Sequence, residues 1–124
     1  MYAKVETDIS NGSQTTVHIA GREMLVPAPE MLLAMKLNSL GNRTKDHKRI
    51  KDMCDITALC LFAGQEREAM IARGLAGADP GKVKTIRPAI MDEDYAQVSG
   101  LLGIPEDTVR ALFERLLSRA SLKY

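Results

Sequence analysis

Between positions 36 and 55, six charged side chains have the types and spacing that chemistry on an anion would need: Lys36, Arg43, Lys48, Lys51, Asp52 and Asp55. Lysine and arginine donate charge-assisted hydrogen bonds to phosphate, and the planar guanidinium can donate two at once. A carboxylate beside such cations orients them. We therefore predict that the four cations bind the phosphates of a nucleotide or another polyanion, and that the two aspartates brace them.

The same residues have a second, purely structural interpretation. A helical wheel places the lysines and aspartates of residues 48–55 on one polar stripe about 100° wide. Leu59 and Phe62 follow on that side, so we expect it to be covered and Asp55 to be at least partly buried, with Lys36 and Arg43 as candidate partners. A ladder of salt bridges between two antiparallel helices would use these residues equally well. The spacing does not decide between the two interpretations.

Two helices have to position this cluster. Pro29 favours the first turn of a helix that ends near Gly41, where we expect a left-handed residue. Thr44 or Asp46 can cap a second helix that runs to Phe62. Further helices are predicted over residues 65–75, 94–102 and 105–121, the last amphipathic.

The first 27 residues have the pattern of strands. Polar and apolar residues alternate over residues 4–10, turn residues follow at 11–13, and a β-branched segment at 15–20 can return antiparallel. Residues 22–26 can add a third short strand. We predict an α+β fold with one domain over residues 1–124, in which a small antiparallel sheet (residues 2–27) precedes a body of four to five helices. Within this domain, residues 1–27 form a β-hairpin or meander. Residues 28–64 form a two-helix Lys/Arg/Asp motif, and residues 65–124 form a helical C-terminal part.

Composition fits a single globular domain and excludes several classes of protein. Of 124 residues 45% are hydrophobic and 27% are charged, and the net charge of +1 gives no overall attraction to nucleic acid or to an anionic membrane. No apolar run is long enough to cross a bilayer, and the amino terminus lacks a signal-peptide pattern, so we expect a cytoplasmic protein. Cys54 and Cys60 fall on different faces of a helix, and we predict two reduced core residues.

Residues 26–59, VPAPEMLLAMKLNSLGNRTKDHKRIKDMCDITAL, resemble the second half of the nucleotidyltransferase-like fold of abortive-infection and type IV toxin–antitoxin toxins. The matching elements are Pro29-Glu30, Lys36-Leu37, Arg43, Lys51-Asp52 and Asp55-Ile56. The resemblance implies a partial nucleotidyltransferase-like fold in which Lys36 lies near nucleotide phosphates and Arg43, Asp52 and Asp55 shape or brace that site. It also implies Mg²⁺ and a nucleoside triphosphate as candidate cofactors, and a strand that carries the third metal-binding carboxylate, for which Glu6 and Asp8 are the candidates.

The chain departs from that family in one important way. Members that transfer nucleotides carry a Gly-Ser or Gly-Gly turn followed by a strand with two acids one residue apart, whereas here Glu6 and Asp8 precede Gly12-Ser13. Two-metal transfer needs such a pair. We therefore expect no independent catalysis. A degenerate binding domain, a half that needs a partner chain and a truncated gene product remain alternatives, and an exposed sheet edge would favour a homodimer or a complex with a partner protein.

A function of another class is also open: a structural or protein-interaction module. Residues 98–112 resemble a helix-turn-helix, with Ser99 in the first helix and Gly103 in the turn. The second helix would open with Glu106 and Asp107, which phosphates repel, so we do not expect DNA binding.

Overall fold

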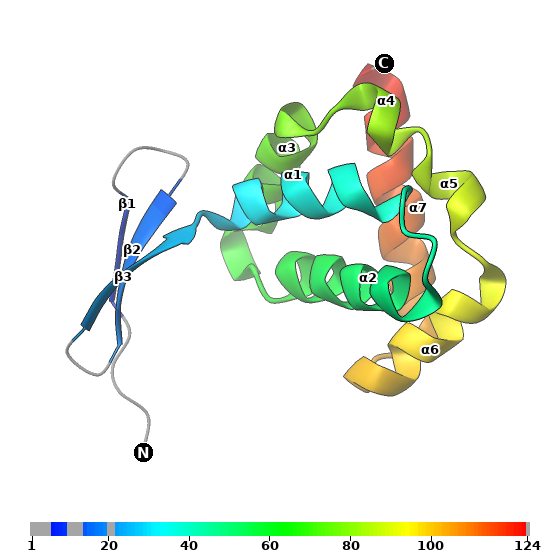
Figure 1. The fold of residues 1–124 in the computed structure, drawn as a ribbon, viewed down its shortest axis with the longest axis horizontal. Coiled ribbons are helices and arrows are strands. Elements are labelled where there is room, and N and C mark those ends of the chain that lie inside the picture. The colour runs from blue at the N-terminus through cyan, green and yellow to red at the C-terminus, as the bar shows by residue number, and fades with distance from the viewer. Residues whose placement is uncertain (1–5, 10–13, 20–21, 124) are drawn as a thin grey trace.

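The computed structural model of the protein describes the backbone of residues 6–9, 14–19 and 22–123, and the side chains of residues 28–120. Three strands come first: β1 (Glu6–Ile9), β2 (Gln14–Ile19) and β3 (Arg22–Pro27). They pair antiparallel in the order β1-β2-β3, with Thr7 opposite Val17 and Val17 opposite Met24. The strands lie to one side of the helices, beside the start of the first one (Figure 1).

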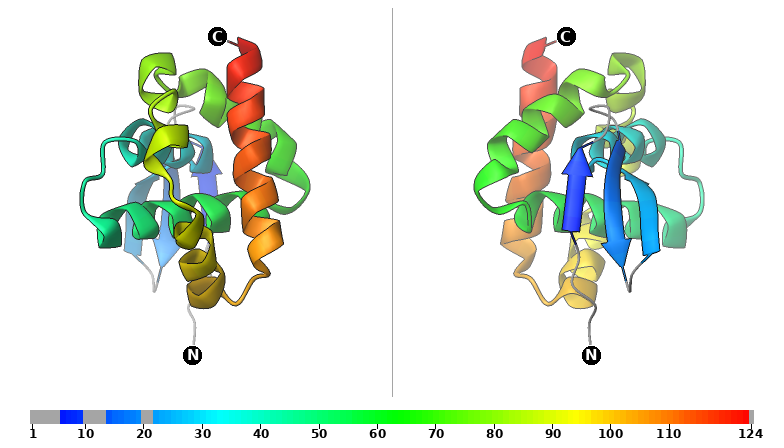
Figure 2. Two further views of the ribbon diagram at one scale, coloured as in Figure 1. Left: turned by 90° about the vertical axis from the view of Figure 1, so that its right-hand side faces the viewer. Right: turned by 90° about the vertical axis from the view of Figure 1, so that its left-hand side faces the viewer.

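The rest of the described chain is helical. Its elements are α1 (Pro29–Leu40), α2 (Asp46–Leu61), the 3₁₀ turn η1 (Gly64–Glu66), α3 (Arg67–Gly77), α4 (Pro80–Val83), α5 (Ile86–Ala89), α6 (Asp92–Leu102) and α7 (Glu106–Lys123). The main contacts of α1 are with α2 and α3, α2 also packs on α6, and α6 packs on α7. The long helix α7 closes the body, with the short α4 beside its C-terminal part (Figures 1 and 2).

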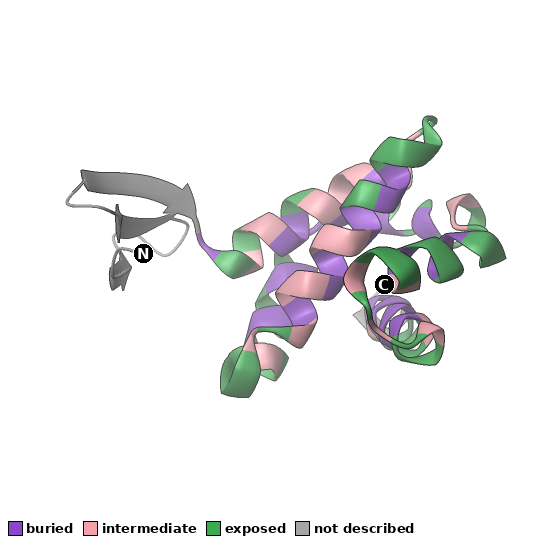
Figure 3. Ribbon diagram, turned by 90° about the horizontal axis from the view of Figure 1, so that it is seen from below, coloured by how far each residue is buried: buried purple, intermediate pink, exposed green. Residues whose placement is uncertain are grey.

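The prediction of an α+β fold is wrong. Residues 28–120 contain no strand, and their buried apolar side chains, apart from that of Ala28, form one cluster contributed by the helices and their caps. The strands make their main contacts with one another and the helices make theirs with helices. Each helix turns its buried side toward another helix (Figure 3). The packed domain is therefore all-α, because the helices cover one another and need no sheet to close their core.

The ends of the first two helices also differ in detail from the prediction. Helix α1 has the predicted limits, but Gly41 is right-handed with φ of −67°. Glycine is needed there for space, since a Cβ would lie 1.8 Å from Thr85 Oγ1. Neither Thr44 nor Asp46 caps α2: its N-cap is Lys45, which makes no side-chain cap, and Asp46 is the first helical residue. Its carboxylate instead contacts Arg49, three residues on.

Candidate functional site

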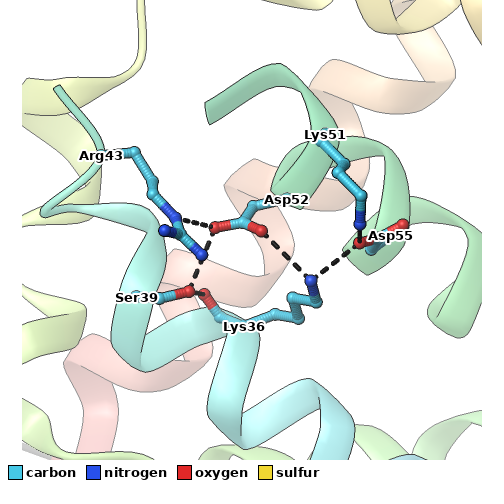
Figure 4. Close-up of polar contacts among 6 residues, drawn as sticks. All are labelled: Lys36, Ser39, Arg43, Lys51, Asp52 and Asp55. Carbon is cyan, nitrogen blue, oxygen red and sulfur yellow. Dashed lines mark hydrogen bonds and ion pairs between the residues drawn. The ribbon is translucent and has the colours of Figure 1, made fainter. Parts of the chain in front are cut away.

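Asp52 is the centre of the polar cluster between α1 and α2. Its carboxylate is only 2% exposed and accepts hydrogen bonds from Lys36 Nζ at 3.2 Å, Ser39 Oγ at 3.1 Å and Arg43 Nε at 2.8 Å (Figure 4). A buried carboxylate is costly unless donors replace the water it has lost. Three donors, two of them cationic, meet that need here.

Asp55 extends the cluster by one turn of α2. Its Oδ2 atom lies 2.9 Å from Lys36 Nζ and 3.0 Å from Lys51 Nζ. Burial raises the pKa of Asp55, but the hydrogen bonds and charges of the two lysines outweigh it and hold that pKa below its ordinary value. The hydrogen bond to Asp55 likewise raises the pKa of Lys36 above its ordinary value, although burial lowers it, and Asp52 adds to the rise. Both groups are therefore charged at neutral pH.

The cluster forms because residues three apart share one face of a helix. Lys36 and Ser39 project from α1, and Asp52 and Asp55 project from the neighbouring α2 (Figure 4). Arg43 reaches in from the segment that joins the two helices. Ser39 was missed from the sequence, although its position three residues after Lys36 is a signal that could have found it.

The structure brings together three of the four predicted cations and both predicted bracing aspartates. Lys36, Arg43 and Lys51 all contact Asp52 or Asp55. Lys48 is exposed, and its side chain has no ion pair or hydrogen bond within the described part of the chain. Asp55 is partly buried, as predicted.

The sequence predicts that the side of α2 carrying Leu59 and Phe62 is covered, but its C-terminal end is uncovered. Leu59 is partly buried against the core, but Phe62 is 77% exposed. Phe62 is the C-cap residue of α2, where the chain turns away into η1, so no described element covers its ring.

A second ion pair, which sequence analysis did not find, is buried completely. Arg49 of α2 donates from Nε to Asp94 Oδ2 at 2.8 Å and from Nη2 to Asp94 Oδ1 at 3.0 Å. Arg49 is 4% exposed and Asp94 is 1% exposed. Asp94 also accepts the backbone N–H of Met91 at 2.9 Å and so caps α6. The partners are 45 residues apart, and no local pattern in the sequence connects them.

The described residues offer no metal site that would support the predicted metal binding. No group of three or more His, Cys, Asp and Glu side chains that could hold a metal ion occurs among them. Glu6 and Asp8 lie in β1, and their side chains fall outside the described ones. The cluster at Asp52 orients three cations, and the hydroxyl of Ser39 donates to a carboxylate that Lys36 and Arg43 also contact.

The pair α6–α7 has the turn expected of the helix-turn-helix resemblance, with Gly103 left-handed at φ of 66°. The arginines of α7 are already engaged with acids. Arg110 contacts Asp92 at 3.2 Å and lies over the ring of Tyr95, and Arg119 contacts Glu68 at 2.9 Å.

Comparison of the chain with protein-family profiles, with curated proteins and with solved structures gave no match. The nucleotidyltransferase-like resemblance thus stays a prediction. Across the described residues, no helix combines the length and the apolar character that crossing a membrane requires.

Proposed function

We propose that this chain is a polyanion-binding domain that takes a nucleotide through Lys36, Arg43, Lys48 and Lys51, without catalysis of its own. The observation that carries the proposal is the geometry of Arg43. Its Nε is anchored on the buried carboxylate of Asp52 at 2.8 Å, and its two Nη groups have no partner among the described residues. The side chain is 35% exposed, so those donors are accessible to a ligand.

Charge supports the same conclusion. Four cations against two carboxylates leave a local charge of +2, which suits a ligand with more than one phosphate. Because Asp52 and Asp55 hold three of the cations in place, less side-chain entropy is lost when an anion binds. Lys48 is exposed and contacts no carboxylate within the described residues, whereas Lys51 is exposed and held by the half-buried Asp55. We place this function in the cytoplasm, where the two free cysteines would stay reduced.

The rival function is a structural or protein-interaction module. One observation favours it: Asp52 already has three donors and Lys36 already contacts two carboxylates, so the cluster is satisfied without a ligand. On that account the cations stabilise α1 against α2 and bind nothing. DNA binding by α6 and α7 has less support, because Arg110 and Arg119 are paired with acids.

Calorimetric titration with ATP and with inorganic triphosphate at low salt separates these functions. Arg43→Lys keeps the charge opposite Asp52 but removes the forked donors, and we expect it to weaken binding about tenfold, the loss of one charge-assisted hydrogen bond. Lys36→Ala should weaken binding at least as much. Lys82→Ala, an exposed lysine of α4, is the matched control and should change nothing. A wild-type protein that binds neither probe would end the proposal and leave the structural module.

A further inference from the structure

Phe62 is the most exposed large apolar side chain among the described residues, and it lies on the face of α2 that carries part of the polar cluster. Lys51, Asp55 and Phe62 follow at intervals of four and seven residues, so they share one face of the helix. The backbone N–H of Phe62 still donates to the carbonyl of Ala58 at 3.0 Å, so the helical geometry extends to this C-cap residue. An open aromatic ring and a group of cations therefore occupy the same face.

Two ammonium groups meet on this face two turns before the ring. Lys36 Nζ and Lys51 Nζ lie 2.9 Å and 3.0 Å from the same atom, Oδ2 of Asp55 (Figure 4). Seven residues separate Asp55 from Phe62, about 10 Å along the helix axis. Arg43 is anchored about one turn further from the ring, on the buried carboxylate of the cluster. The order along α2 is thus an aromatic ring, a pair of ammonium groups and a guanidinium.

The parts of a nucleotide with more than one phosphate follow in the same order. A nucleobase is flat and stacks on aromatic rings, and the phosphates at the other end of the molecule bind cations. The turn between the ring and the cations holds Ala58 and Leu59, which are uncharged and half-buried and leave room for a sugar. A protein partner fits this face less well, because protein interfaces bury contiguous apolar patches and Phe62 is the one large apolar side chain exposed on α2 in the described chain.

We propose that Phe62 is the base-stacking residue of the anion site, with the base on its ring and the phosphates on Lys36, Lys51 and Arg43. This inference rests on the proposed function, since it requires these cations to bind phosphate. It adds a contact for the base to a site defined so far by its phosphate contacts alone. The ligand is then a nucleoside di- or triphosphate rather than an inorganic phosphate chain, with little preference among bases, because every base has a π face.

Calorimetric titration with ATP and with inorganic triphosphate tests the inference, because only ATP carries a base. Phe62→Ala should weaken ATP binding about tenfold, the loss of one base–aromatic stack, and leave the binding of inorganic triphosphate unchanged. Leu101→Ala is the matched control: it removes the next most exposed large apolar side chain, 69% exposed at the end of α6, and should affect neither probe. Circular dichroism establishes that each variant is folded.

Fluorescence supplies an independent readout. The chain has no tryptophan, so Phe62→Trp places a single indole at the proposed stacking position. ATP should quench its emission and inorganic triphosphate should not, whereas Leu101→Trp should respond to neither.

The outcomes separate this inference from the proposed function. If the wild type binds both probes but Phe62→Ala weakens both equally or neither, the base contact is wrong and polyanion binding stands. A Phe62→Trp chain that responds equally to both probes, or to neither, also refutes the base contact. A wild type that binds neither probe overturns the proposed function and this inference together.

Discussion

Replacement of Arg49 by methionine removes one half of the buried pair that joins α2 to α6. The two hydrogen bonds, 2.8 and 3.0 Å long, are lost, and the carboxylate of Asp94, 1% exposed, keeps only the backbone N–H of Met91. Breaking a buried ion pair by removing one partner costs about 3–5 kcal/mol, because the other charge is left unpaired. A domain has only about 5–15 kcal/mol of stability in total. We therefore expect Arg49→Met to take a large share of it.

Arg87 and Glu114 provide the matched control. Nη1 of Arg87 donates to both carboxylate oxygens of Glu114 at 3.0 Å, and the two side chains are 52% and 54% exposed. Water solvates both charges when the pair is broken, so Arg87→Met should cost no more than about 1 kcal/mol. Both substitutions replace an arginine that is paired with a carboxylate, and the largest difference between the two pairs is their burial.

Urea unfolding followed by circular dichroism measures both variants. The double variant Arg49→Met with Asp94→Asn should be more stable than the sum of the single losses predicts, because neutralising Asp94 removes the unpaired charge while its side-chain oxygen can still accept the N–H of Met91. If Arg49→Met costs as little as Arg87→Met, burial is not what sets the strength of this pair, and the reasoning fails.

Three further predictions follow from the glycines, the thiols and one carboxylate. Gly100→Ala should stabilise α6 by about 0.5–1 kcal/mol through helix propensity. Gly74→Ala should destabilise the fold by about 1–3 kcal/mol, because its Cβ would lie 2.6 Å from a side-chain atom of α1. Thermal unfolding that finds the Gly74→Ala variant more stable than the Gly100→Ala variant would contradict the packing of α1 on α3. Burial raises the pKa of Cys60 to about 11, so a thiol reagent at about pH 8 should label the half-buried Cys54 first, and mass spectrometry that finds Cys60 labelled first in the folded protein would refute this. Asp55→Asn should lower the free energy of unfolding by up to about 1 kcal/mol at neutral pH. Because the pKa of Asp55 in the folded protein lies below the ordinary 3.8, this difference in stability should persist above about pH 3.8 and vanish as the pH falls through the lower pKa. A difference that stays unchanged in acid would show that the ion pairs of Asp55 are not its cause.

The polar cluster could largely be predicted from sequence because it depends on local geometry. Lys36 on one helix and Asp52 and Asp55 on the next are brought together by helical spacing and by the short segment between α1 and α2. That segment also holds Arg43, a predicted candidate partner of Asp55 that contacts Asp52 instead. Helical spacing could not predict that Lys48 makes no contact with Asp52 or Asp55, because that depends on whether its flexible side chain lies within reach of a carboxylate.

The sequence by itself determined where the main helices run and which residues share a face, since each follows from the 3.6-residue period of the backbone. The limits of α1 and the contact of Lys36 with Asp55 belong to this part. Tertiary structure alone decided that the core is all-α, that Arg49 is buried against Asp94, and that Phe62 is uncovered. Burial depends on which distant element covers a face, and a local period carries no information about that.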